Sequence, residues 1–145
     1  MAFTNPSSED IRTLLERVRR IAVVGLSPKT DRPSYKVASA LQGFGYRIIP
    51  VRPMATEILG EKVYSDLASV PDHIDLVDVF RAPEQVDEVI DACIALRVPA
   101  VWLQDGVVNE AAAQRAHDAG LMVVMDRCVY RDYVLLFGVV PRSVP

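Results

Sequence analysis

Short, almost wholly apolar runs recur along the chain, separated by longer stretches of mixed polarity. These runs occupy residues 20–25, 46–51, 74–80, 99–103 and 121–125. Apolar runs of about four to eight residues are typical of strands buried on both faces, as in a parallel sheet covered by helices. The pattern therefore predicts five parallel strands.

Between these runs, apolar residues recur at helical spacing and predict amphipathic helices. The helices are expected at residues 8–19, 34–43, 83–97, 108–119 and 127–137. Side chains suited to N-caps stand near the start of three of them, namely Ser7 or Ser8, Ser34 and Asn109. The irregular stretch at 52–71 predicts only a short hairpin around Gly60 and one helical turn at 65–69.

Strands that alternate with helices are joined by right-handed crossovers and form a layered α/β fold. We therefore expect residues 1–145 to form one Rossmann-like, doubly wound, three-layer sandwich, a five-stranded parallel sheet with helices on both faces. The expected strand order, numbered along the chain, is 3-2-1-4-5. Ligands of such sheets bind at the carboxyl ends of the strands, where the order reverses. The corresponding loops are 25–34, 51–54, 80–84 and 103–109.

Composition narrows the class of protein. Of 145 residues, 50% are apolar and 24% are charged, which excludes a disordered chain. No apolar run approaches the roughly 18 residues of a membrane-spanning helix, and the N-terminus has no signal-peptide pattern. Cys93 and Cys128 give neither a disulfide framework nor a metal-ligand cluster. We expect a cytoplasmic protein without a membrane partner and without a bound metal.

The charge is unevenly distributed. The net charge of −3 argues against a nucleic-acid partner. Residues 27–52 nevertheless carry five basic side chains against Asp31 alone. A basic region in an acidic protein favours an anionic small molecule, and a solvated helix face is the alternative interpretation.

The loop after the first strand carries the clearest chemistry. Gly25 permits a tight turn and a close approach of a ligand, while Ser27 and Ser34 offer hydroxyl groups. Lys29 and Arg32 add positive charge next to the free N–H groups that begin the following helix. This combination predicts a pyrophosphate-binding loop, although it matches neither G-x-G-x-x-G nor the Walker A pattern. An ordinary strand-to-helix turn is the alternative.

The next strand ends add to this prediction. Arg52, between Val51 and Pro53, stands where an NAD site has an acidic residue, so it suits the ribose phosphate of NADP or CoA instead. Phe80 can contact an adenine and Arg81 a phosphate, although Phe80 can equally belong to the core.

The ends of the last two predicted strands lie where we expect the part of the ligand remote from its phosphates. Gln104 and Gly106 follow the fourth strand. Cys128 follows the fifth strand next to Arg127, whose charge would favour a reactive thiolate. An inert buried cysteine is the alternative, and Cys93 fits the apolar face of its helix. The sequence contains no other catalytic constellation.

Short segments spread along most of the chain carry a family resemblance. They are Ile21–Lys29, Asp31–Tyr35, Gly45–Tyr46, Ile49–Val51, Asp78–Arg81, Trp102–Gln104, Gly106–Val107, Asn109–Glu110 and Val123–Cys128. In this order they resemble small bacterial CoA-binding proteins, which are similar to the CoA-binding domain of the succinyl-CoA synthetase α subunit. The resemblance covers about residues 8–132. The synthetase's phosphorylated histidine belongs to a later domain, so its activity is not expected here.

The resemblance implies a Rossmann-like, NAD(P)-binding-like fold with coenzyme A lying across the strand ends. The expected cofactor-binding residues are Gly25, Ser27, Pro28, Lys29, Arg32, Pro33, Ser34, Tyr35, Val51, Arg52, Pro53, Phe80, Arg81, Gln104 and Gly106. Relatives often have Asn or Ser where this chain has Arg52, a change that either strengthens a phosphate contact or blocks the pocket.

Three functional interpretations follow. The first is a non-catalytic module that binds CoA or acyl-CoA as a carrier, sensor or accessory subunit. The second is an enzyme that uses NADP or an acyl thioester, with Cys128 as a reactive thiol. The third is a scaffold whose pocket Arg52 has altered. Apolar residues near the C-terminus suggest a homodimer surface or, as the alternative, a cover for the sheet: Tyr133, Leu135, Leu136 and Phe137. A protein partner of another kind is also left open.

Overall fold

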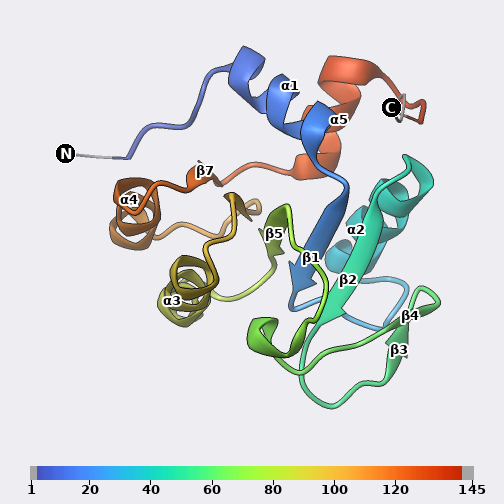
Figure 1. The fold of residues 1–145 in the computed structure, drawn as a ribbon. Helices are drawn as coiled ribbons and strands as arrows, with labels where there is room; N and C mark the ends of the chain where they lie inside the picture. The colour runs from blue at the N-terminus through green and yellow to red at the C-terminus, as the bar shows by residue number, and fades with distance from the viewer. Residues whose placement is uncertain (1–2, 142–145) are drawn as a thin grey trace.

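A computed structural model describes residues 3–141 and contains the predicted parallel sheet. Its strands are β1 (Arg20–Val24), β2 (Arg47–Val51), β5 (Leu76–Val79), β6 (Ala100–Leu103) and β7 (Met122–Met125). Each lies within one of the predicted apolar runs (Figure 1). The Rossmann-like α/β architecture is therefore confirmed.

The predicted strand order is wrong in one respect. The sheet runs β2-β1-β5-β6-β7, which is 2-1-3-4-5 along the chain rather than 3-2-1-4-5. Pro50 explains the difference, because a proline lacks the N–H of a central strand and favours a sheet edge. β2 is accordingly an edge strand, and β5 pairs with β1 instead. The order reverses between β1 and β5, which places the ligand-binding position of the fold there.

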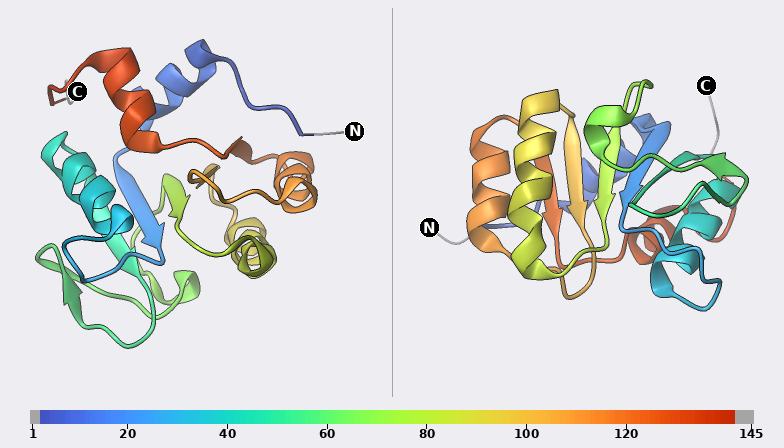
Figure 2. Two further views of the ribbon diagram at one scale, coloured as in Figure 1. Left: turned by 180° about the vertical axis from the view of Figure 1, so that it is seen from behind. Right: turned by 90° about the horizontal axis from the view of Figure 1, so that it is seen from below.

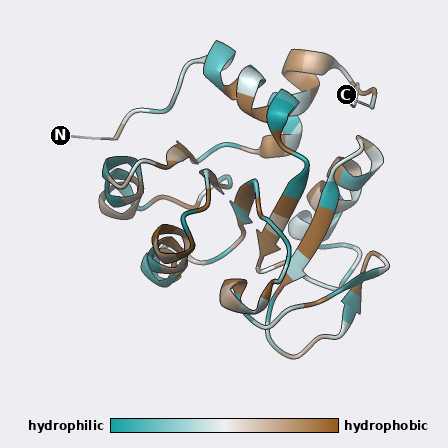
Figure 3. Ribbon diagram, viewed as in Figure 1, coloured by the Kyte–Doolittle hydropathy of each residue, from teal (hydrophilic) through white to brown (hydrophobic). Residues whose placement is uncertain are grey.

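Helices cover both faces of the sheet. α1 (Ser8–Arg17), α2 (Pro33–Gly43) and α5 (Val129–Phe137) pack on one face, and α3 (Val86–Leu96) and α4 (Glu110–Asp118) pack on the other. Figure 2 shows the three layers. The hydropathy colouring in Figure 3 shows apolar residues concentrated in the strands and on the helix sides that face them. Two buried apolar clusters, one on each face, hold the layers together.

Two of the three predicted N-caps are present. Ser7 accepts a hydrogen bond from the N–H of Asp10 at α1, and Asn109 accepts one from Ala112 at α4. Ser34 is not a cap, because α2 already begins at Pro33, whose fixed φ suits the first helical position. Its hydroxyl oxygen instead accepts a hydrogen bond from the N–H of Ser27, at 3.0 Å.

The segment between β2 and β5 follows the prediction. The strands β3 (Glu57–Ile58) and β4 (Glu61–Lys62) form the hairpin around Gly60, and a 3-10 turn, η1, covers Leu67–Ser69. Tyr64 then pairs with the outer edge of β2. A second 3-10 turn, η2 (Pro83–Gln85), forms the start of the predicted 83–97 helix and leads into α3.

The expected dimer surface is partly buried within the chain. Tyr133 lies on the buried side of α5, is fully buried, and stacks its ring on Phe44 with the ring centroids 4.0 Å apart. Leu136 and Phe137 are half-buried, and only Leu135, at 74% exposure, stands free. Tyr133 therefore contributes to the core and not to a surface. Among the described residues, no helix has the length and apolarity that crossing a membrane requires.

Candidate functional site

The carboxyl ends of the strands open into a cleft of about 750 Å³. Most residues predicted to bind the cofactor line it: Gly25, Ser27, Lys29, Arg32, Pro33, Ser34, Arg52, Phe80, Arg81 and Gln104. Cys128, the candidate reactive thiol, lines it as well. Val37, Asp105 and Val107 complete the lining and were missed from the sequence, because no motif distinguishes them.

Gly25 marks the reversal point between β1 and β5. Its φ of +86° is a conformation that favours glycine. A Cβ at this position would lie only 2.2 Å from the carbonyl oxygen of Phe80. Backbone hydrogen bonds of 2.9 Å fix this approach, from Gly25 to Val51 and from Phe80 to Val24. The absence of a side chain is therefore required for the two loops to meet.

The loop after β1 is held in shape by its own polar groups. The N–H of Lys29 donates to the Ser27 hydroxyl at 3.1 Å, and the N–H of Ser27 donates to that of Ser34 at 3.0 Å. The N–H of Arg32 donates to the carbonyl oxygen of Lys29. Leu26 is fully buried and anchors the loop on the core. Both hydroxyl groups keep their own protons for a ligand that faces the cleft.

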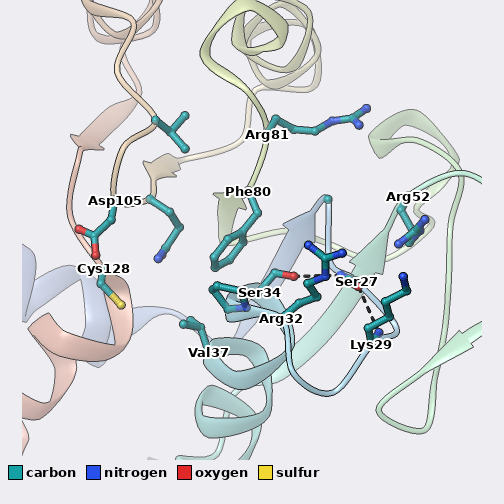
Figure 4. Close-up of a pocket in the computed structure, with 14 residues that line it drawn as sticks. Ser27, Lys29, Arg32, Ser34, Val37, Arg52, Phe80, Arg81, Asp105 and Cys128 are labelled. Atoms are coloured by element: carbon teal, nitrogen blue, oxygen red, sulfur yellow. Dashed lines mark hydrogen bonds between the residues drawn. The ribbon is translucent and has the colours of Figure 1, made fainter.

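Four cations from three loops surround this part of the cleft: Lys29, Arg32, Arg52 and Arg81. None of them forms a salt bridge with another residue of the described range 3–141. The Nε atom of Arg81 is buried and has no hydrogen-bond partner there. Figure 4 shows Arg52 and Lys29 on one side of the cleft, with Cys128 and Asp105 on the other. Unpaired positive charges and an unsatisfied buried donor suit an anionic ligand.

The opposite end of the cleft is built by β6 and α5. Gln104 is 4% exposed, and its Oε1 accepts a hydrogen bond from the N–H of Val129 at 3.2 Å. Cys128 is 8% exposed and is the N-cap residue of α5. Asp105 pairs with Arg131 at 2.8 Å.

Arg127 does not have the role expected from its place next to Cys128. Its guanidinium makes two hydrogen bonds to the buried carboxylate of Asp132, at 2.8 and 2.9 Å. These bonds raise the pKa of Arg127 and neutralise its charge locally. Arg131, one helical turn further on, is paired with Asp105 in the same way, and this hydrogen bond raises the pKa of Arg131.

Five predicted cofactor-binding residues do not line the cleft: Pro28, Tyr35, Val51, Pro53 and Gly106. Pro53 lines an adjoining pocket of about 240 Å³, which shares Gly25, Arg52, Phe80 and Arg81 with the cleft. Val51 is buried in β2, and Gly106 shapes its loop through an N–H that donates to Asp126. Their contact with a ligand stays a prediction.

Asp78 is a feature that the sequence interpretation missed. It is fully buried in β5 between Val23 and Trp102, and neither carboxyl oxygen has a hydrogen-bond partner in the described chain. Burial raises the pKa of Asp78 well above its ordinary value, so the neutral acid is favoured. Phe80, two residues further along the same strand face, lines the cleft. The signal in the sequence was a carboxylate between Val77 and Val79 in the middle of a strand.

The prediction that Cys93 belongs to the core is confirmed. It is fully buried on α3, and burial raises the pKa of its thiol to about 12. Within residues 3–141, no group of three or more His, Cys, Asp or Glu side chains is placed to hold a metal ion.

Comparison with known proteins gives close relatives of similar length. The uncharacterized protein YneT of Bacillus subtilis is 45% identical over 125 residues, which are 86% of this chain and 93% of YneT. A hypothetical protein from Pyrococcus horikoshii has a solved structure with a TM-score of 0.88 and 37% identity, covering 95% of this chain and all of that one. PH1109, in a form redesigned for binding, gives a TM-score of 0.90 at 36% identity, over 94% of this chain and 96% of its own.

More distant similarity extends to larger enzymes. An ADP-forming acetate–CoA ligase of Archaeoglobus fulgidus is 31% identical over 77 residues, which are 52% of this chain but 11% of the ligase. The sequence profile of the CoA binding domain matches residues 19–133, most of the chain and every strand of the sheet. The chain therefore belongs to the CoA binding domain family.

Proposed function

We propose that the cleft binds coenzyme A or an acyl-CoA. The observation that carries the proposal is the set of four unpaired cations around the cleft, with the buried Nε of Arg81 unsatisfied. A CoA molecule has a pyrophosphate and a ribose phosphate that can match these charges. Membership of the CoA binding domain family supports the same ligand.

The positions of the cations suggest how the ligand lies. Lys29 and Arg32 flank the loop after β1, where free helix N–H groups and two serine hydroxyls suit the pyrophosphate. Arg52 and Arg81 line both the cleft and the adjoining pocket, and they suit the ribose phosphate. Phe80 lines both the cleft and the adjoining pocket and offers an aromatic contact to the adenine. The pantetheine arm then extends toward Gln104 and Cys128.

We propose a binding role, as a carrier, sensor or accessory subunit, and not an independent ligase activity. The corresponding segment makes up about a tenth of the acetate–CoA ligase of Archaeoglobus fulgidus, which supports its use as one module of a larger enzyme. The free thiols of Cys93 and Cys128 favour a reducing, cytoplasmic location.

Calorimetric titration with CoA, dephospho-CoA and NADP tests the ligand. We expect micromolar binding of CoA, weaker binding of dephospho-CoA, which lacks the ribose phosphate, and no binding of NADP. An Arg52→Ala variant should reduce the difference between CoA and dephospho-CoA. Binding of NADP without CoA, or unchanged affinity for dephospho-CoA, would contradict the assignment.

A further inference from the structure

The inner end of the cleft contains a hydrogen-bond donor of fixed direction. A backbone N–H can only donate, so the contact with Val129 identifies the inner atom of the Gln104 amide as its oxygen. The Nε2 group of Gln104 then faces away from the start of α5, and it donates to no residue in the part of the chain described. Gln104 is 96% buried, and its exposed part lines the cleft. Among the described residues, the Nε2 group of Gln104 therefore stabilises no part of the fold through a hydrogen bond.

Cys128 lines the same end of the cleft. It is the N-cap residue of α5, a helix of nine residues, so it lies at the positive end of the helix dipole. Arg131, one turn along this helix, is paired with Asp105 at 2.8 Å, so its charge is already compensated. Negative charge that develops on the sulfur during a reaction is therefore favoured by the N-terminus of α5. Cys93, buried in α3, has no comparable surroundings.

We propose that Cys128 accepts an acyl group from a CoA thioester bound in the cleft, an inference that rests on the proposed CoA binding. With the phosphates held near Lys29 and Arg52, the thioester extends to the opposite side, where Cys128 lies (Figure 4). Val37 and Val107 line the cleft as well and offer apolar contacts to a short aliphatic acyl chain. A short-chain acyl-CoA is therefore the substrate class.

The step is a transthioesterification. The sulfur of Cys128 attacks the carbonyl carbon, a new carbon–sulfur bond forms, and the bond between that carbon and the CoA sulfur breaks. CoA leaves with the proton that Cys128 released, so no oxidant or reductant is required. Gln104 Nε2 donates to the carbonyl oxygen while negative charge develops on it, as the donors of an oxyanion hole do. The product is S-acyl-Cys128 and free CoA.

Acetyl-CoA is the probe for the test. After incubation with excess acetyl-CoA, intact-mass spectrometry should show one added acetyl group per chain, and peptide mapping should place it on Cys128. The rate should saturate with acetyl-CoA, and excess free CoA should remove the label by the reverse reaction. Cys128→Ala should abolish labelling, whereas Cys93→Ala is the matched control and should label as the wild type does.

Gln104→Glu tests the donor directly. This variant keeps an oxygen that can accept from Val129 but replaces the N–H donor with a second acceptor. We expect acylation to be at least tenfold slower, with CoA affinity changed less than threefold and the melting temperature measured to confirm folding. Acylation at the wild-type rate would exclude a role of Gln104 in the step.

A small thioester separates specific transfer from general thiol chemistry. S-acetyl-N-acetylcysteamine carries the acyl group without the nucleotide, and it should acylate Cys128 much more slowly than acetyl-CoA at equal concentration. Equal rates would overturn the proposal. CoA binding by calorimetry without any acyl transfer would overturn it as well and leave the proposed function standing. Absence of CoA binding would instead refute the proposed function.

Discussion

Replacing Gly25 with alanine tests whether the contact between the loops after β1 and β5 holds the cleft together. The added Cβ would lie 2.2 Å from the carbonyl oxygen of Phe80. Real Cβ atoms essentially never approach another heavy atom more closely than 3.0 Å. The two loops must therefore separate by nearly 1 Å. The hydrogen bond from Phe80 to Val24, now 2.9 Å, lies directly beside this contact and would be strained.

The expected loss of stability has two parts. A left-handed backbone costs a residue with a side chain roughly 1–2 kcal/mol. Weakening one or two backbone hydrogen bonds adds about 0.5–1.5 kcal/mol for each bond. We expect Gly25→Ala to lower the free energy of unfolding by about 2–4 kcal/mol, which urea denaturation measures. CoA affinity should fall in parallel, because the loops that carry Lys29 and Arg81 move apart.

Gly60→Ala is the matched control. Gly60 has a φ of +75°, similar to that of Gly25, but no heavy atom lies within 4 Å of its added Cβ. This variant should lose only the backbone part, about 1–2 kcal/mol, and should bind CoA as the wild type does. If Gly25→Ala loses no more stability than Gly60→Ala, the contact with Phe80 does not constrain the loops and the reasoning is wrong.

Three further changes test other parts of the molecule. Lys29→Ala combined with Arg32→Ala should weaken CoA binding at least tenfold by calorimetry, since charged hydrogen bonds contribute about 1.5–3 kcal/mol each; unchanged affinity would contradict the phosphate assignment. Asp78→Asn should remove a pH dependence. Because burial raises the pKa of Asp78 above 3.8, the folded state retains a proton that the unfolded chain loses, so wild-type stability relative to the variant should fall as pH rises above 3.8. A constant difference between pH 3 and 8 would refute this. Asp132→Ala should destabilise the fold by about 1–2 kcal/mol in urea, because Arg127 loses two charged hydrogen bonds, while its side chain is 40% exposed and water offsets part of the loss. Unchanged stability would contradict this.

Periodicity and turn chemistry predicted most of the fold, because both are local. The five strands and the helices follow from apolar spacing, and Asn109 and Ser7 were recognisable as caps. Strand order depends on pairing between segments that are distant in the sequence, so the apolar pattern of each strand does not predict it. Pro50 was the one residue that carried this information, since it marks β2 as an edge strand.

The candidate site was predicted to a similar extent. Residues next to strand ends were found, because the carboxyl ends of parallel strands meet at one edge of the sheet. Val37 and Val107 were not, since an apolar residue that lines a cleft looks like one that fills a core. Arg127 was assigned to the wrong neighbour, because adjacency along the chain does not show that its side chain turns toward Asp132.

Asp78 shows why local patterns cannot reveal every functional constraint. A buried carboxyl group without a hydrogen-bond partner costs free energy, and an apolar residue in its place would pack between Val23 and Trp102 without that cost. Asp78 stands two residues before Phe80, which lines the cleft that the unpaired cations surround. Because burial favours the neutral acid, Asp78 adds no negative charge near the cleft. Ionisation of Asp78 would instead place a negative charge beneath those cations and weaken anion binding. The same burial that destabilises the fold thus preserves the positive potential of the proposed phosphate site.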